Sequence, residues 1–441
     1  MPHTDTRTPF TDHLAEHGLI LRELTQSSVS AAENPAVARQ YRTVERGFYE
    51  EPPTGEALDQ WLGLSLQDGR RFLRVYPQDA DPAQTDPVGT FVDFVKGLHV
   101  GGAREVPAWL ISSITVAPTH RRRGILRAMM RESLQTSLDR GVPVAALTAS
   151  EGGIYSRFGF GVVNSFRSIE VEVQGGLPLR GPAPTGSVRL VEPRELDGLG
   201  DELYRRAYLQ TPGSVERTAS YRVEETDANL HRNGGKGTGL YAAVHYDDGG
   251  SPRGFVTYRF GGWEKKPQTM EVQSFITTTA QSHRALWQFL GSLDLIDRIS
   301  WQAAPDDGLL EAMVVDRRRI RTTATQDRLW LRILDVPAAL SARSWSQDGS
   351  ILLTVTDSMG WAEGTWRVDV VGGEATVSRA ESTAAPDLSM DVAELGSVWL
   401  GGISPEVLRQ AALVTEHRPG AVAELGRMLA QDRPVHCMTG F

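Results

Sequence analysis

The clearest hydrophobic pattern in the chain lies between residues 111 and 148. Residues 111–116 (Ile-Ser-Ser-Ile-Thr-Val) are mostly apolar or β-branched, which is typical of a buried strand, and Pro118 ends this run. Further on, apolar residues recur at helical spacing, at Ile125, Leu126, Met129, Met130, Leu134 and Leu138. A second apolar run, Val144 to Thr148, follows Gly141-Val142-Pro143. The order predicts strand, turn, helix and strand, with the turn open to a ligand.

The predicted turn has the composition of a phosphate site. Arg121, Arg122 and Arg123 precede Gly124 and the start of the helix. A helix N-terminus offers unpaired N–H groups and a partial positive charge, and arginine adds forked donors that suit phosphate oxygens. Gly124 lets the backbone approach a ligand because it has no Cβ. A run of arginines alone also fits a solvated basic surface, and it is the position between strand and helix that favours the phosphate site.

Alternating residues predict further strands before this unit. They lie at residues 20–24, 71–76, 89–94 and 109–116. A polar helical stretch is expected after the first strand, through Tyr41 and Phe48, and residues 1–17 are expected to form a mobile tail. The strands would form an antiparallel meander that leads into the turn.

A second region repeats this order. Strands are predicted at residues 187–192, 239–245, 254–259 and 272–278, and a helix follows at residues 284–290. The turn between them, residues 279–284 (Thr-Ala-Gln-Ser-His-Arg), has neither the glycine nor the arginine cluster. We therefore expect a second copy of the fold whose phosphate site is absent.

In the third region the predicted strands come first in the sequence and the predicted helices come last, which predicts an α+β layer. Strands are expected at residues 329–333, 351–355, 364–370, 375–378 and 388–392, and helices at 405–414 and 421–429. A stretch rich in Pro and Gly marks a linker between the first two regions. The predicted limits are residues 1–174, a linker at 175–186, residues 187–315 and residues 316–441.

Composition narrows the function classes. The chain of 441 residues carries a net charge of −9, which argues against nonspecific nucleic-acid binding. No apolar run approaches the ~18–20 residues of a membrane span, and the first residues lack a signal-peptide core, so a cytoplasmic location is expected. Cys437 is the one cysteine, which excludes an intramolecular disulfide and fits a reducing compartment. We interpret it as a small residue near the chain end rather than a nucleophile.

Two motifs resemble those of a known family. The segment from Arg121 to Leu126 resembles the acyl-CoA-binding motif of the GNAT N-acetyltransferases, Gln/Arg-x-x-Gly-x-Gly/Ala; Arg121 and Gly124 match it and Leu126 departs from it. Residues 150–160 (Ser-Glu-Gly-Gly-Ile-Tyr-Ser-Arg-Phe-Gly-Phe) resemble the family's closing Tyr-x-x-x-Gly-Phe signature. With the chain length and the terminal Phe441, the chain is similar to the Eis (enhanced intracellular survival) acetyltransferases over nearly its whole length, and most strongly over residues 110–165.

The resemblance implies a fold and a reaction. The fold class would be α+β / α/β, with tandem GNAT-like domains, the second degenerate, followed by a sterol-carrier-protein-like domain. Acetyl-CoA would be the co-substrate. The acceptor would be a polycationic amine such as an aminoglycoside, acetylated at one or several positions, or a lysine side chain. The resemblance also implies a homohexamer.

The resemblance assigns the acetyl-CoA site to residues of the first domain. The turn and the helix start would hold the pyrophosphate, and the backbone of the preceding strand would face the pantetheine arm and the carbonyl. The two residues that precede the aromatic signature would touch the pantetheine arm. The implied residues are Arg121, Arg122, Arg123, Gly124, Ile125, Leu126 and Arg127, then Ile114, Thr115 and Val116, and then Ser150 and Glu151.

Tyr155 is the candidate general acid. A phenol with a pKa near ~10 can give its proton to a leaving thiolate whose pKa is near ~8.5 at small cost. The residue pattern alone equally fits a core tyrosine packed beside Phe158 and Phe160. By resemblance the family's acid lies at this point, which favours the catalytic role.

No Asp or Glu of the core is nominated as general base by its position. By resemblance, the base is the C-terminal carboxylate of Phe441, whose ring would anchor it in an apolar site. A frayed terminus is the ordinary alternative, and His436 is a fallback base. Glu50 and Glu51, in a loop rich in aromatic residues and Pro, are weak candidates for binding the acceptor cation.

Two further alternatives remain open at this point. His13, Glu16 and His17 formally match a metal-binding spacing, but they lie in the expected tail and no third ligand follows nearby, so no metal is expected. With no cysteine placed as a nucleophile, we expect direct attack in a ternary complex. The rival hypothesis is a CoA- or lipid-binding regulatory module that transfers no acetyl group.

Overall fold

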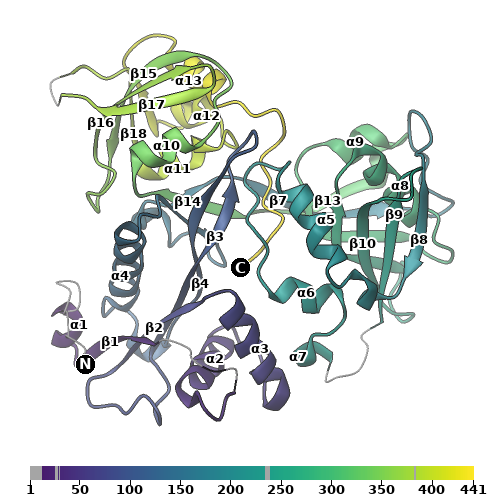
Figure 1. Ribbon diagram of the computed structural model, residues 1–441, viewed down its shortest axis with the longest axis horizontal. Coiled ribbons are helices and arrows are strands. Elements are labelled where there is room, and N and C mark those ends of the chain that lie inside the picture. The colour runs from purple at the N-terminus through teal and green to yellow at the C-terminus, as the bar shows by residue number, and fades with distance from the viewer. Residues whose placement is uncertain (1–11, 25–27, 29, 234–238, 382–383) are drawn as a thin grey trace.

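The computed structural model describes residues 12–24, 28, 30–233, 239–381 and 384–441. Three sheets form the core of the molecule (Figure 1). The first has the strand order β1 (Leu19–Leu24), β2 (Arg71–Pro77), β3 (Gly89–His99), β4 (Glu105–Val116), β5 (Val144–Thr148), β14 (Leu329–Ile333) and β6 (Gly161–Val162). The pairs from β1 to β4 are antiparallel, as the meander predicts, and β4 pairs parallel with β5.

Helices cover both faces of the first sheet. The helix α4 (Ile125–Asp139) packs on one face against Leu73, Phe91 and Trp109. The helices α2 (Pro35–Gly47) and α3 (Gly55–Gln67) contribute to the core on the other face. Neighbouring residues such as Phe72 and Leu73 point to opposite faces because side chains alternate along a strand. Residues 12–16, expected in a mobile tail, form the short helix α1 (Asp12–Glu16), and residues 1–11 lie outside the described part.

The second sheet repeats the architecture. Its order is β13 (Ile320–Asp327), β7 (Ser165–Glu172), β12 (Arg298–Pro305), β11 (Thr269–Thr277), β10 (Pro252–Phe260), β9 (Leu240–Tyr246) and β8 (Ser187–Val191). As in the first sheet, a parallel pair, β11 and β12, brackets a helix, α8 (Ala280–Leu290). The remaining helices are α5 (Leu199–Tyr208), α6 (Ser220–Glu225), α7 (Leu230–Asn233) and α9 (Leu309–Met313).

In the third domain one helix precedes the first strand of the sheet, and the other helices come late in the sequence. Its order is β17 (Glu374–Arg379), β16 (Gly364–Val371), β15 (Gly349–Thr356), β18 (Leu388–Asp391) and β19 (Val414–Glu416). Its helices are α10 (Val336–Ala342), α11 (Val392–Trp399), α12 (Pro405–Gln410) and α13 (Ala421–Met428). The buried ion pair between Arg332 on β14 and Asp357, 2.8 Å apart, ties this domain to the first sheet.

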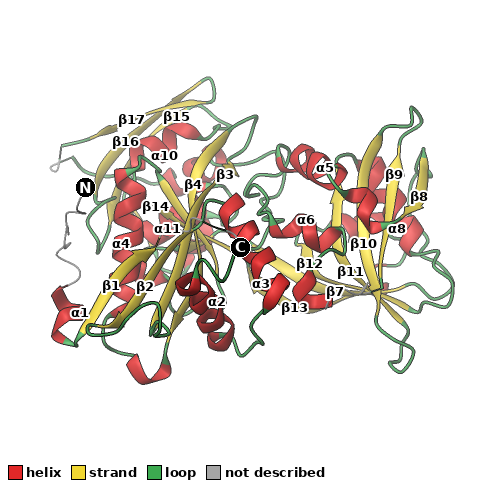
Figure 2. Cartoon of the chain, turned by 60° about the horizontal axis from the view of Figure 1, so that its bottom comes forward, coloured by secondary structure: helices red, strands yellow, loops and turns green. Residues whose placement is uncertain are grey.

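The sheets do not end at the predicted domain limits. Strand β7 lies within the range predicted for the first domain, residues 1–174, but it pairs in the second sheet. Strands β13 and β14 lie within the range predicted for the third domain, yet they pair in the second and the first sheet respectively. The chain therefore crosses between the first two domains twice, at β6–β7 and at β13–β14 (Figure 2). An apolar strand pattern does not say which sheet a strand joins, so these crossings were not predicted.

Several local predictions in the third region are wrong. Residues 320–327 were not expected as a strand and form β13. The strand expected through Val392 ends at Asp391, whose side chain accepts a hydrogen bond from the Ala393 N–H and so caps α11. The helix expected to reach Val414 ends at Gln410, and the left-handed conformation of Ala412 (φ 60°) turns the chain into β19.

Candidate active site

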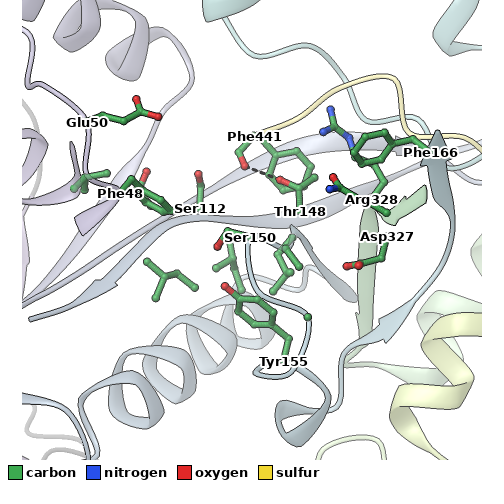
Figure 3. A pocket seen from close by; sticks show the side chains of 18 of the residues that line it. Phe48, Glu50, Ser112, Thr148, Ser150, Tyr155, Phe166, Asp327, Arg328 and Phe441 are labelled. Carbon is green, nitrogen blue, oxygen red and sulfur yellow. Dashed lines mark hydrogen bonds between the residues drawn. The ribbon is translucent and has the colours of Figure 1, made fainter. Parts of the chain in front are cut away.

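A cavity of about 850 Å³ lies where the first domain meets the β13–β14 connection and the chain end (Figure 3). Glu50 lies at one end of the view, and Asp327 and Arg328 lie at the other. The lining residues come from six segments: Val44, Glu45, Phe48 and Glu50; Ile111, Ser112, Ser113 and Ile114; Leu147, Thr148, Ala149, Ser150, Gly152 and Tyr155; Phe166; Gln326, Asp327 and Arg328; and Phe441.

The cavity opens because β4 and β5 diverge. Their parallel pairing stops at Ile111 and Leu147, while β4 continues for five more residues. A bulge follows in β4, where Ser113 has a left-handed backbone (φ 51°). The buried Thr90 stabilises the bulge, since its hydroxyl donates to the Ser113 carbonyl (3.0 Å) and lies 2.6 Å from Thr115 Oγ1. Of the three predicted strand residues, Ile114 lines the cavity, and Thr115 and Val116 continue the strand toward the turn.

The predicted phosphate turn leads into α4 as expected. Gly124 is the residue before the helix and has φ 75°, and no side chain of the described residues caps the helix start. Among the residues that the structure describes, no side chain accepts a hydrogen bond from the N–H groups of Ile125, Leu126 and Arg127, and such N–H groups suit an anion. The Ile125 side chain is buried in the core, so only its backbone faces a ligand.

The arginines of the turn are largely solvent-facing. Arg121, Arg122 and Arg127 are exposed, and Arg123 is half-buried and donates to the Thr119 carbonyl (3.4 Å). None of the residues 121–127 lines the cavity, and residues 115–120 separate the turn from Ile114, which does line it. A Cβ on Gly124 would lie 2.6 Å from the His13 ring.

Tyr155 lies below the cavity in Figure 3 with its hydroxyl pointing into it. The side chain is 6% exposed, and its ring packs edge-on against Phe160 and Trp330. Burial raises the pKa of the Tyr155 phenol, the Ser150 side chain lowers it, and the Glu151 charge raises it. The phenol therefore holds its proton at neutral pH. Ser150 lines the cavity, whereas Glu151 is exposed beside it.

The last residue of the chain enters the cavity from the opposite side. A terminal oxygen of Phe441 accepts a hydrogen bond from Thr148 Oγ1 (2.9 Å), and the ring packs edge-on against Phe94, with centroids 6.4 Å apart. The ring thus contacts the apolar core of the first domain. Phe441 and Tyr155, which are distant in sequence, lie at the same cavity.

Two other titratable groups near the chain end lie away from the cavity lining. Burial, and then the charge of Arg328, lower the pKa of His436 to about 4, so the imidazole is neutral. Burial raises the pKa of the Cys437 thiol, which donates to the Thr439 carbonyl (3.0 Å). These environments favour neither His436 as a base nor Cys437 as a nucleophile.

A pair of carboxylates lines the end of the cavity next to α2. Glu45, near the end of that helix, was missed in the sequence. Burial, followed by the charge of Glu50 and a hydrogen bond with it, raises the pKa of Glu45 to about 7. Glu50 lines the cavity as predicted, and Glu51 does not. A charged residue in a polar helix gives no signal that it faces a cavity, which is why only the loop residues were nominated.

The described residues hold no group of three or more His, Cys, Asp or Glu side chains that could bind a metal ion. His13 and His17 lie edge to face 5.0 Å apart, and His13 contacts Glu16 (3.1 Å). Over the same residues, no helix is both long enough and apolar enough to cross a membrane.

Comparison with known proteins identifies the family. Residues 35–163 and 213–333 each match the acetyltransferase (GNAT) domain, and residues 336–438 match the sterol carrier protein domain. N-acetyltransferase Eis of Mycobacterium tuberculosis is 34% identical over 394 residues, which cover 88% of this chain and 92% of that protein. This chain belongs to the Eis family of N-acetyltransferases. An uncharacterized N-acetyltransferase of Streptomyces avermitilis is 37% identical over 364 residues, 80% of this chain and 86% of that protein.

Solved structures agree with the Eis architecture. The crystal structure of Eis1 from Mycobacterium abscessus matches with a TM-score of 0.78 and 29% identity, and covers 96% of this chain and 100% of that chain. A GCN5-related N-acetyltransferase from Anabaena variabilis shares the fold with a TM-score of 0.76 at 18% identity. The predicted fold class, two GNAT domains followed by a sterol-carrier-protein-like domain, is confirmed, and the chain is an N-acetyltransferase. Its GNAT domains imply acetyl-CoA as the acetyl donor.

Proposed function

We propose that this Eis-family enzyme acetylates amino groups of polycationic acceptors, aminoglycosides first and lysine side chains second, by direct attack on acetyl-CoA in a ternary complex. The observation that carries the proposal is the shared cavity of Tyr155 and Phe441, with Glu45 and Glu50 at one end. Its volume of about 850 Å³ is within the range of small-molecule sites.

Acetyl-CoA would bind along β4 and the turn that follows it. The uncapped start of α4 and the guanidinium groups of Arg121, Arg122 and Arg123 suit the pyrophosphate. The divergence of β4 from β5 leaves the edge of β4 beyond Ile111 without a strand partner on that side, which suits the amides of the pantetheine arm and the thioester oxygen.

The acid and the base would act on the two sides of the reacting centre. The Phe441 carboxylate takes a proton from the acceptor ammonium, directly or through a water, and the freed amine attacks the acetyl carbon. The new C–N bond forms, the C–S bond breaks, and Tyr155 gives its proton to the leaving sulfur. The nitrogen then loses its second proton, which restores the Tyr155 phenol. A free α-carboxylate, with a pKa near ~3.5, is a weak base for an ammonium whose pKa is near ~10.4. The Thr148 hydroxyl and the packing of the Phe441 ring on Phe94 would hold this carboxylate in place to receive the proton.

The acceptor would be held by carboxylates. A bound ammonium favours the ionised form of Glu45, whose pKa of about 7 means that it carries a proton part of the time in the free enzyme. Glu50 beside it adds a second negative charge. A polyamine can present one amine to this pair while another reaches the reacting centre.

Thiol release from acetyl-CoA, scanned over aminoglycosides, simple polyamines and lysine peptides, tests the proposal. We expect turnover with acceptors that carry several amines, and a loss of about a hundredfold or more in kcat for Tyr155→Phe with an unchanged KM for acetyl-CoA. Acetyl-CoA binding without acetylation of any amine would overturn it. The proposed homohexamer rests on the family resemblance alone, and the particle mass in solution tests it.

A further inference from the structure

The last six residues of the chain run along the second domain before they reach the cavity. The His436 N–H donates to the Pro212 carbonyl (2.9 Å), and the Ser214 hydroxyl donates to the His436 carbonyl (2.8 Å). Thr439 is fully buried, and its hydroxyl donates to the Val215 carbonyl (3.2 Å). The segment is therefore held by hydrogen bonds and does not fray.

Two tyrosines of the second domain touch this segment through their hydroxyls. The Tyr204 hydroxyl, from α5, lies 2.5 Å from Thr439 Oγ1 and also donates to the Val215 carbonyl. The Tyr221 hydroxyl, from α6, accepts a hydrogen bond from the Gly440 N–H (2.7 Å). Gly440 is the residue directly before Phe441, so the Tyr221 hydrogen bond holds the chain next to the residue that bears the terminal carboxylate.

A buried arginine orients both tyrosines. The Arg217 guanidinium lies between the two rings, 4.3 Å from the centroid of Tyr204 and 4.7 Å from that of Tyr221. Two hydrogen bonds to Glu225, one of them 2.6 Å long, neutralise its charge. A guanidinium stacked between aromatic rings in a buried site is well fixed. Burial raises the pKa of both phenols, so both hydroxyls stay protonated and keep their hydrogen bonds.

We infer that the Tyr204–Arg217–Tyr221 stack is a clamp that positions the terminal carboxylate in the cavity of the first domain. The second domain fixes the chain as far as Gly440, and Thr148 and Phe94 of the first domain fix Phe441 itself. Tyr204, Arg217 and Tyr221 are positioning residues, because they act through the chain end and none of them lines the cavity. This inference rests on the proposed role of the Phe441 carboxylate, and it gives the second domain a part in the reaction.

The sharpest variant is Tyr221→Phe, which removes the acceptor of the Gly440 N–H and keeps the ring on Arg217. We expect kcat to fall about fivefold to tenfold, as for the loss of one buried hydrogen bond, with an unchanged KM for acetyl-CoA. The matched control is Tyr241→Phe, since Tyr241 is a half-exposed tyrosine on β9 of the same domain and stacks on Tyr258. The control should behave as wild type.

A second pair of variants distinguishes the loss of a hydrogen bond from a loss of packing. Thr439→Val removes the hydroxyl that meets Tyr204 and nearly keeps the volume, and Thr439→Ser retains that hydroxyl. We expect kcat to fall in the valine variant and to be largely restored in the serine variant, with equal acetyl-CoA binding. A role in packing alone predicts the reverse order, because valine fills the buried site better than serine.

Carboxypeptidase A, which removes aromatic C-terminal residues, reports on the chain end without any need for acetyl transfer. Release of Phe441, followed by mass spectrometry, should be several times faster in Tyr221→Phe than in wild type or Tyr241→Phe. Equal release rates together with an unchanged kcat in Tyr221→Phe would overturn the clamp. The test also separates the clamp from the proposed base. If the protein without Phe441 keeps its turnover, the terminal carboxylate is not the general base. Faster release of Phe441 from Tyr221→Phe would then still show that the clamp holds the chain end.

Discussion

The two GNAT domains share a strand–turn–helix unit but differ in how the helix begins. In the first domain α4 follows Gly124, and no side chain of the described residues caps it. In the second domain α8 follows Thr279, whose hydroxyl accepts a hydrogen bond from the Ser282 N–H (3.1 Å). A capped helix start has already satisfied a donor that a phosphate would otherwise use. The comparison teaches that the two copies differ in the state of the helix cap as well as in the arginine cluster, and both differences fit the proposal that only the first copy binds a phosphate.

The second domain nevertheless keeps its polar groups for another purpose. Its hydroxyls from Tyr204 and Tyr221 and its carbonyl from Val215 hold the segment that ends at Phe441. The first domain supplies most of the cavity lining, Tyr155 and the predicted phosphate turn, and strands β7 and β13 of the second sheet add Phe166, Gln326 and Asp327 to the lining. We interpret the pair as one site built by two copies of a fold, one that binds the ligands and one that orients the chain end.

The largest loss of kcat is expected when Phe441 is removed, at the cavity where the chain end held by the second domain meets the first domain. Removal of Phe441 takes away the proposed base and the ring that packs on Phe94, and it leaves the phosphate turn intact. We expect kcat to fall about a thousandfold, in the range known for general base catalysis. Acetyl-CoA affinity, measured by calorimetry, should stay within about twofold of wild type, and a matching loss of affinity would contradict the separation of the two parts.

A smaller effect is expected when the helix start of the first domain is changed. In Gly124→Ala the new Cβ would lie 2.6 Å from the His13 ring at a backbone φ of 75°, a conformation that costs an L-residue about 1–2 kcal/mol. We expect the KM for acetyl-CoA to rise about tenfold, as measured in steady-state kinetics.

Gly308→Ala is the matched control for that experiment. Gly308 precedes α9 in the second domain with φ 68°, and its Cβ would meet no atom within 4 Å. The control should lose a similar free energy of unfolding and keep its KM for acetyl-CoA. If both variants show the same KM, the helix start of the first domain does not bind the co-substrate.

Much of the first domain was predictable because its signals are local. The strand, the turn with Gly124 and the helix lie within thirty consecutive residues, and Tyr155 follows in a short aromatic signature. The role of Phe441 was expected from the family resemblance alone, since nothing in the pattern near the chain end distinguishes a fixed residue from a frayed one.

The rest of the site could not be predicted, because distant segments build it. Asp327 and Arg328 reach the cavity where the chain crosses from the second sheet to the first: Asp327 is the last residue of β13, and Arg328 connects β13 to β14. Phe166 arrives on β7, the strand that crosses in the other direction. The partners of such crossing strands depend on packing between sheets, which a linear pattern of apolar residues does not encode.

A few-fold, pH-dependent effect is expected at Glu45. Since its pKa is raised to about 7, the carboxylate ionises as the pH rises from 6 to 8, and the KM of a polycationic acceptor should fall several-fold over that range. Glu45→Gln should flatten this part of the profile. Parallel KM profiles for wild type and Glu45→Gln would refute the role of Glu45 in binding the acceptor.

The raised pKa of Glu45 also has an effect on stability. As the pH rises from the pKa of Glu45 in the unfolded chain to about 7, the free energy of unfolding should fall, because the folded state binds the proton more tightly.

The smallest kinetic effect is expected at the capped helix of the second domain. Thr279→Ala removes the cap of α8 and should lower the free energy of unfolding by about 1 kcal/mol, measured by urea denaturation. Both kcat and the KM for acetyl-CoA should match wild type at a temperature well below the transition. A changed KM would mean that the second turn takes part in co-substrate binding after all.

The most direct test of the central claim replaces one functional group. A semisynthetic protein that carries the amide of Phe441 in place of its carboxylate keeps the ring on Phe94 and an oxygen that can accept from Thr148. Its kcat for a polyamine acceptor, compared with that of the same protein ligated with the free acid, should fall about a hundredfold or more while the KM for acetyl-CoA stays unchanged. Equal kcat values for the amide and the acid would contradict the claim that the terminal carboxylate is the general base.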